Sequence, residues 1–155
     1  MPSGQLGHPR QRKRNSRPMN KLIGALVVAA AVVAGCSSSP AEASSRVTLR
    51  NFRIDAPESV SAGDVRLAIA GAGPTMHELA IARTDLAPDA LPLAKNSTVD
   101  DERDLPGFHK VGEEEGVDLG DHRVMTVRLD PGHYVLYCNM PGHYLAGMHT
   151  ELVVQ

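Results

Sequence analysis

Cysteine, histidine and methionine recur at an even spacing near the end of the chain and could together bind a metal ion. Within YCNMPGHYLAGM, residues 137–148, they are Cys138, His143 and Met148, each five residues from the next. Taken singly, each of these residue types is more often a core or surface residue than a ligand. An extended chain would spread the three over about 33 Å, so their convergence requires the chain to fold back.

The same stretch contains residues that such a reversal needs. Pro141 and Gly142 suit the second and third positions of a type II turn, and Gly147 allows a second reversal just before Met148. We therefore expect a thiolate, an imidazole and a thioether to meet. This ligand set is soft and has one weak member, which indicates copper rather than magnesium, calcium or a closed zinc site.

A site of this kind needs a second imidazole, and the chain has seven histidines. We choose His77, which lies in GPTMHEL, residues 73–79, where a chain reversal leads into an apolar strand. In a β-sandwich we expect that position at the end of the neighbouring sheet. His149 directly follows Met148 and would point away from the site, and His133 lies in a turn, so we expect both to face solvent.

The elements that must position these side chains are strands. From Arg46 onward, apolar residues alternate with polar ones and turn residues separate the runs. The alternation changes phase at Arg50 and Asn51, which predicts a bulge or bend there. Short strands separated by turns predict an all-β domain over residues 46–155, an antiparallel β-sandwich. The apolar positions that carry the pattern are Val47, Leu49, Phe52, Ile54, Val65, Leu67, Ile69, Leu79, Ile81, Met125, Val127 and Leu129, with the runs 134–138 and 152–154.

Residues 84–121 depart from this pattern. They are acidic, contain DDERD and EEEG, and are interrupted by Pro88, Pro92 and Pro106. A plain loop of this length is uncommon in a compact domain, so we expect a short helix or an extra strand within it. The acidic clusters are interpreted as a solvated face or, alternatively, as a docking surface for a basic partner.

The beginning of the chain is interpreted as a targeting signal. Residues 22–35, LIGALVVAAAVVAG, are apolar. At 1.5 Å per residue they cover about 21 Å, which is shorter than the roughly 30 Å core of a bilayer. Because a basic stretch precedes them, residues 1–35 are predicted to be a signal peptide. Residues 36–45 are small and polar and are predicted to be a flexible tether.

Charge is divided unevenly along the chain. Six basic residues and no acid precede position 36, whereas residues 36–155 carry ten Lys or Arg against 18 Asp or Glu, a formal charge of −8. Such a surface repels phosphate backbones, so we do not expect nucleic-acid binding. A chain of 155 residues leaves no room for a multidomain enzyme, and we expect a monomer.

The two histidine-containing stretches together resemble the blue-copper cupredoxins, the plastocyanin and azurin kind, and most of all their small membrane-tethered members. The resemblance covers residues 47–154 and rests on GPTMHEL followed by YCNMPGHYLAGM, with 61 residues from His77 to Cys138. It implies a Greek-key β-sandwich with copper at one end. The ligands it implies are His77, Cys138 and His143, with Met148 as a long axial ligand.

The chain departs from the cupredoxin pattern directly after the first histidine. Many members have Asn there, and this chain has Glu78. A carboxylate adds negative charge close to the metal, so the reduction potential cannot be carried over from the resemblance.

The residues before position 37 resemble a second known pattern. VAGC, residues 33–36, is similar to a bacterial lipobox, which implies cleavage before Cys36 and lipidation of its thiol. The protein would then be extracytoplasmic and anchored to a membrane by lipid, in the periplasm or on the outer face. A competing interpretation is a metal-free interaction lipoprotein with a disulfide between Cys36 and Cys138. Lipidation of Cys36 would exclude it.

A copper site with four protein ligands has no open position for a substrate. It suits the gain and loss of one electron, so we expect an electron carrier that serves redox partner proteins, not an enzyme. A copper carrier or chaperone using the same ligands is the alternative. Around His143, we hypothesise an apolar docking patch, or merely a roof over the site, formed by Met140, Pro141, Tyr144 and Leu145.

Overall fold

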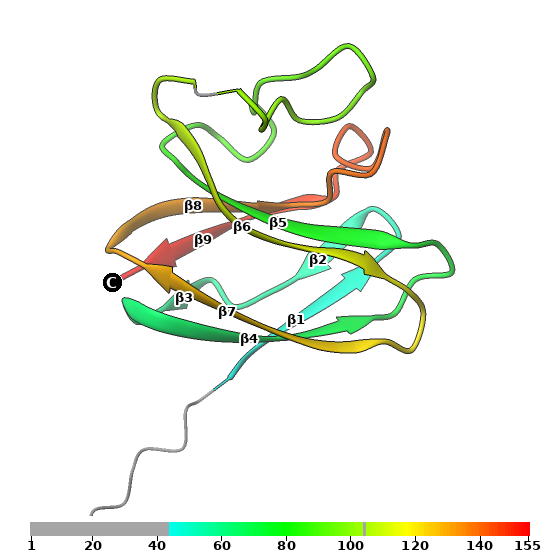
Figure 1. Cartoon of the computed structure of the whole chain (residues 1–155), viewed down its shortest axis with the longest axis horizontal. Coiled ribbons are helices and arrows are strands. Elements are labelled where there is room, and N and C mark those ends of the chain that lie inside the picture. Colours follow the sequence, from blue (N-terminus) through cyan, green and yellow to red (C-terminus); the bar gives the residue numbers. More distant parts are fainter. Residues whose placement is uncertain (1–43, 104) are drawn as a thin grey trace, which may run out of the picture. The chain divides into compact units, whose positions relative to one another are not determined.

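A computed structural model describes residues 44–103 and 105–155, which fold into two β-sheets stacked face to face (Figure 1). The predicted signal peptide at 1–35, the predicted lipidation site Cys36 and all but the last two residues of the predicted tether at 36–45 lie outside these residues. Ser45 is already part of the first strand. In the described part of the chain, no helix has the length and apolar character needed to cross a membrane.

The first sheet has four strands in the order β2-β1-β4-β7. Its longest pairing joins β4 and β7, in which Val65 lies opposite Val127 and Leu67 opposite Met125. Side chains alternate between the two faces of a strand, so these apolar residues share one face and form one wall of the core. The strands are β1 (Ser45–Arg50), β2 (Arg53–Asp55), β4 (Gly63–Gly71) and β7 (His122–Leu129).

The second sheet has five strands in the order β3-β9-β8-β5-β6. At its centre β8 pairs antiparallel with both β5 and β9, and β5 pairs antiparallel with β6. The strands are β3 (Ser59–Val60), β5 (His77–Thr84), β6 (Phe108–Val117), β8 (Gly132–Tyr137) and β9 (His149–Val154).

The main core lies between the two sheets. It contains Cys138 and Met148 from the predicted metal site and the apolar residues that the sequence singles out, except Phe52, Val135, Tyr137 and Val153. Burying apolar side chains against one another removes them from water and is the main force that holds the two sheets together.

The sheets are mixed, so the prediction of a purely antiparallel sandwich is wrong in part. β1 pairs parallel with β4, and β3 pairs parallel with β9. An alternating pattern records which side chains face the core, but it carries no information on the direction of the neighbouring strand. Of the bulge or bend predicted at Arg50 and Asn51, the structure has the bend. It is the turn of a hairpin in which Arg50 pairs with Arg53 and Phe52 adopts a φ of 60°.

Of the two structures expected within residues 84–121, the extra strand is present as β6, and the described residues there contain no helix. We call residues 85–103 and 105–107, which connect β5 to β6, the insertion segment. It covers the face of the second sheet that points away from the main core and forms a smaller apolar cluster there. The cluster consists of Ala80, Ala82, Leu91, Val99, Phe108, Val135, Tyr137 and Tyr144.

Candidate metal centre

His77 and Cys138 come together because of how their strands pair. His77 is the first residue of β5, and Cys138 directly follows the last residue of β8. β5 and β8 are antiparallel neighbours, so the start of one lies beside the end of the other. His77 is therefore in the neighbouring strand of the same sheet, and the expectation that it lies in the other sheet is wrong.

The residues between Cys138 and Met148, which we call the ligand loop, fold back as the turn residues predict. The His143 amide donates to the Met140 carbonyl at 3.0 Å, closing a turn in which Gly142 has a φ of 81°. The Met148 amide then donates to the His143 carbonyl at 3.1 Å, and the Cys138 amide donates to the Met148 carbonyl at 3.0 Å. The backbone of Met148 is thereby held beside that of Cys138.

Three of the predicted ligands converge. One ligand atom each from His77, Cys138 and His143 lie within 4.8 Å of one another. Cys138 Sγ is 3.4 Å from His143 Nδ1, and the two imidazole rings have centroids 5.3 Å apart. The side chain of Met148 is fully buried in the same core cluster as Cys138. Cys138 is a free cysteine.

The imidazole of His77 lacks the partners that buried polar groups normally have. His77 is fully buried, and neither ring nitrogen has a hydrogen-bond partner among the residues that the structure describes. Leaving a buried polar group unsatisfied costs about 1–3 kcal/mol, and a metal bound to one nitrogen would remove part of that cost. Burial, with a smaller contribution from His143, lowers the pKa of His77, so its ring is neutral and able to bind a metal at neutral pH. The donor set therefore fits a soft metal ion.

The thiol of Cys138 is also fully buried, but it has backbone partners. Burial raises its pKa, and the backbone amides of Glu78 and Met140 oppose this by hydrogen bonding to the sulfur. The Glu78 amide lies 3.4 Å from Cys138 Sγ. Amide hydrogens directed at a sulfur stabilise its thiolate form, which is the form that binds a metal.

Neither a protein-family model nor a curated protein matches this chain. Solved structures do match, over 71% of the chain. A dithionite-reduced auracyanin from the photosynthetic bacterium Roseiflexus castenholzii matches at 17% identity and a TM-score of 0.51, with 94% of that protein covered. Auracyanin B matches at 23% identity and a TM-score of 0.50, with 86% covered. Reduced rusticyanin matches at 15% identity and a TM-score of 0.50, with 76% covered.

The fold is that of the cupredoxins. Within this cupredoxin fold, His77, Cys138 and Met148 lie at one end of three adjacent strands, β5, β8 and β9. Figure 1 shows the ligand loop, in orange, beside the insertion segment, in green.

Glu78, the residue at which this chain departs from the cupredoxin pattern, has an acidic environment. Its carboxylate lies with those of Asp101 and Glu113, with one oxygen from each within 4.8 Å of the others. Burial first, and then the charges of Glu113 and Asp101, raise the pKa of Glu78 to about 7. The side chain is thus partly protonated at neutral pH, which reduces the negative charge that it adds near Cys138.

The predicted docking patch needs one correction and one addition. Tyr144 is only 3% exposed, because its ring packs in the smaller apolar cluster, so it cannot be part of a docking surface. Leu145 and Pro141 are exposed and Met140 is partly exposed. Phe52, which the sequence did not suggest, is 49% exposed and lies edge-on to the ring of His143, with centroids 5.5 Å apart.

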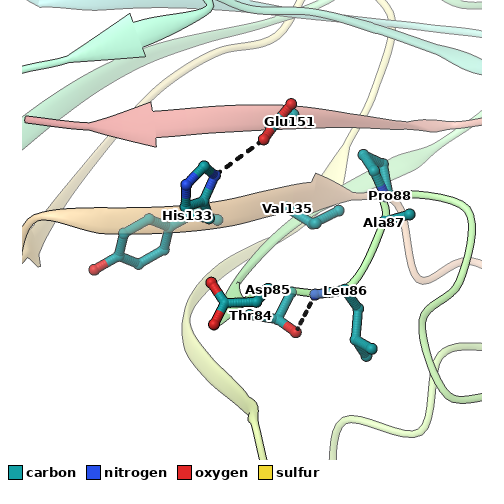
Figure 2. A pocket seen from close by; sticks show the side chains of 9 residues that line it. Thr84, Asp85, Leu86, Ala87, Pro88, His133, Val135 and Glu151 are labelled. Carbon is teal, nitrogen blue, oxygen red and sulfur yellow. Dashed lines mark hydrogen bonds and ion pairs between the residues drawn. The ribbon is translucent and has the colours of Figure 1, made fainter.

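The two histidines set aside as ligands do lie outside the group of three. His133 is exposed, as expected, and its Nδ1 lies 3.1 Å from a carboxylate oxygen of Glu151. Figure 2 shows this pair at a surface pocket by the start of β8, the end of that strand away from Cys138. His149 was expected to face solvent, and this is wrong. It is half-buried, with its ring centroid 5.0 Å from that of Tyr144.

Proposed function

We propose that this chain is an extracytoplasmic type 1 copper protein that shuttles single electrons between redox partner proteins. The observation that carries the proposal is the meeting of a buried thiol with two imidazoles. Both nitrogens of one imidazole are buried and have no partner within the described part of the chain. The likeness of the fold to auracyanins and rusticyanin, two of them in reduced form, supports it.

The residues that would hold copper are Cys138, His77 and His143, with the thioether of Met148 as a weaker fourth ligand. Bound there, copper would supply a centre that gains and loses one electron. The loop hydrogen bonds fix the backbone on both sides of His143, and β5 fixes His77. Ligands held in this way keep nearly the same positions in both oxidation states, which favours rapid electron transfer.

The burial of the ligands favours an electron carrier over the alternative, a copper carrier or chaperone. The side chains of His77, Cys138 and Met148 are fully buried, and only His143 is partly exposed. An acceptor protein could not reach the buried ligands without opening the core, whereas an electron needs only the exposed edge of an imidazole. The closed ligand set also leaves no position for a substrate, which argues against an enzyme.

The location rests on the sequence before the domain. Cleavage before Cys36 and lipidation of its thiol would anchor the domain to a membrane through the tether, in the periplasm or on the outer face of the cell. Mass measurement of the mature N-terminus tests this: a diacylated or triacylated Cys36 is expected, and an unmodified one would contradict the anchor. A monomer is expected in detergent-free solution for the domain without its lipid.

The direct test of the centre is a visible absorption spectrum of the purified domain during addition of Cu(II). An intense thiolate-to-copper charge-transfer band is expected at one equivalent, and it should bleach on reduction and return on oxidation. Zn(II), which has no redox chemistry, serves as the control and should give no band. A colourless protein at saturating copper would contradict the proposal.

Copper uptake should release a proton and depend on pH. Because burial raises the pKa of the Cys138 thiol, the metal-free protein holds that proton at neutral pH, and the thiol must lose it to bind. His77 contributes no proton, because burial lowers its pKa. We expect about one proton released per copper at pH 7 and an affinity that rises about tenfold per pH unit up to the thiol pKa. An indicator-dye titration in weak buffer measures the release, and a pH-independent affinity would contradict it.

Leu145→Glu should slow electron exchange without changing the copper spectrum. Leu145 is 56% exposed, two residues from His143, and a charge there would oppose another copy meeting the same face. We expect electron self-exchange between oxidised and reduced copies, measured by NMR line broadening, to fall about tenfold or more.

Leu86→Glu is the matched control, because Leu86 is 43% exposed and follows the far end of β5 from His77. At 3.3 Å per residue, β5 separates His77 from Thr84, two residues before Leu86, by about 23 Å. Equal exchange rates for the two variants would mean that electrons do not pass through the face around Leu145.

A further inference from the structure

The insertion segment does more than cover the second sheet, because it is hydrogen-bonded to the ligand loop and to the strand that leads into it. Tyr137 and Asn139, the two neighbours of Cys138, both bond to it. So do Gly142 and Tyr144, the two neighbours of His143. Each of these two proposed copper ligands is therefore flanked on both sides by residues tied to the same segment.

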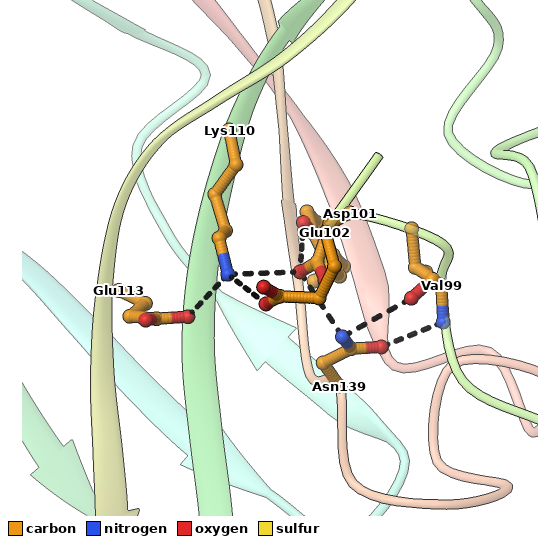
Figure 3. Close-up of polar contacts among 7 residues, drawn as sticks. Val99, Asp101, Glu102, Lys110, Glu113 and Asn139 are labelled. Atoms are coloured by element: carbon orange, nitrogen blue, oxygen red, sulfur yellow. Dashed lines mark hydrogen bonds and ion pairs between the residues drawn. The ribbon is translucent and has the colours of Figure 1, made fainter. Parts of the chain in front are cut away.

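Around Cys138 the connection runs through the side chain of Asn139. Its Oδ1 accepts from the Val99 amide at 2.6 Å, and its Nδ2 donates to the Val99 carbonyl at 3.3 Å, much as a neighbouring strand would (Figure 3). The same Nδ2 donates to Asp101 at 3.0 Å, and the Tyr137 hydroxyl donates to Asp101 at 2.8 Å.

The carboxylate of Asp101 is held firmly in place. Its side chain is 3% exposed, and besides its two hydrogen bonds it lies 3.6 Å from the ammonium group of Lys110 on β6. A buried carboxylate with this many partners is satisfied and rigid, whereas loss of one partner would leave a costly unpaired group. Asp101 therefore gives Asn139 and Tyr137 a fixed point of attachment.

Around His143 the connection runs through Tyr144 and Gly142. The Tyr144 hydroxyl donates to the Pro88 carbonyl at 2.9 Å and accepts from the Leu91 amide at 2.8 Å, inside the smaller apolar cluster. The Gly142 amide donates to the Ser97 carbonyl at 3.1 Å. Pro88, Leu91 and Ser97 are well separated along the insertion segment. These contacts join all three to one turn of the ligand loop.

We propose that the insertion segment is a brace that positions Cys138 and His143 for copper, with Asn139 and Tyr144 as its positioning residues. This inference rests on the proposed copper function. The brace sets the loop in its binding geometry before the metal arrives and resists its distortion afterwards. Tyr144, which contacts Pro88 and Leu91, packs in the smaller apolar cluster and not in the main core.

Tyr144→Phe tests the brace with little change to packing, since it removes the hydroxyl that bonds to Pro88 and Leu91 and keeps the buried ring. Asn139→Ala is the second variant and removes the bonds to Val99 and Asp101. Tyr134→Phe is the matched control. Tyr134 is 2% exposed, and its hydroxyl donates to the Asp130 carbonyl at 2.9 Å near the start of β8, away from the ligand loop.

Two measurements distinguish positioning from general stability. In the metal-free protein, exchange of the Gly142 amide hydrogen should accelerate about five- to tenfold in Tyr144→Phe. In the copper-loaded protein, release of copper to a chelator should accelerate by a similar factor and the charge-transfer band should shift. Asn139→Ala should show the same changes. Tyr134→Phe should lower the melting temperature about as much as Tyr144→Phe does. It should change neither the exchange of Gly142, nor copper release, nor the charge-transfer band.

The proposed brace is contradicted if Tyr144→Phe and Asn139→Ala show the same rates as Tyr134→Phe. The two rates to compare are the hydrogen exchange of the Gly142 amide and the release of copper. Failure of the proposed function has a different signature, because the parent protein itself would then show no charge-transfer band. In that case the exchange of Gly142 in the metal-free variants still decides whether the insertion segment holds the loop.

Discussion

Cys138→Ser is expected to abolish the intense visible band of the copper-loaded protein and to weaken Cu(II) binding by more than about 100-fold. Residues that merely support metal ligands contribute 10–100-fold to affinity, and Cys138 is proposed as a ligand and as the source of the charge-transfer transition. A serine hydroxyl stays protonated at neutral pH and does not replace a thiolate on a soft metal.

The metal-free Cys138→Ser protein should still fold. Serine is close in size to cysteine, and its hydroxyl can accept from the Glu78 amide that now lies 3.4 Å from Cys138 Sγ. We expect a loss of about 1–2 kcal/mol in the free energy of unfolding from burying a more polar atom. Isothermal titration with Cu(II) and the visible spectrum give the result, with His133→Ala as a control that should match the parent. Tight binding and unchanged colour in Cys138→Ser would remove the basis of the proposed centre.

The ligand loop could be predicted from the sequence because its signals are local. The even spacing of Cys138, His143 and Met148, together with the turn residues Pro141 and Gly142, lies within one short stretch, and the structure folds it back there. His77 could be found for a related reason. A histidine after a chain reversal, at the first residue of an apolar strand, is placed at the end of that strand.

What the sequence could not provide are the contacts between distant segments. The sequence left open whether Tyr144 belongs to a docking patch or to a roof over the site, because its burial depends on Pro88 and Leu91, more than 50 residues away. Phe52 gave no sign of approaching His143, since only the hairpin between β1 and β2 brings it there. The parallel pairing of β1 with β4 was missed because an alternating pattern does not encode the direction of the neighbouring strand.

Gly73→Ala is expected to displace His77 and to weaken copper binding about tenfold or more, although residue 73 binds nothing itself. A Cβ atom built on Gly73 would collide with Nε2 of His77 and would lie 2.6 Å from Oδ1 and 2.9 Å from the backbone nitrogen of Asn51. The imidazole is fully buried and the Asn51 nitrogen is backbone, so neither can move away freely. Overfilling a packed site of this kind costs about 1–3 kcal/mol, which should appear as a lower melting temperature of the metal-free domain.

Gly112→Ala provides the matched control for this substitution. A Cβ atom at Gly112 would meet only side-chain atoms of Val127 and Met125, the nearest at 3.4 Å. The φ of Gly112 lies outside the left-handed region that side chains avoid. It should leave copper affinity unchanged and alter the melting temperature little. The clash at Gly73 falls on a proposed ligand. Only Gly73→Ala should therefore lose more copper affinity than its lower stability accounts for. Parent-like affinity in Gly73→Ala would mean that the position of His77 against this backbone does not govern binding.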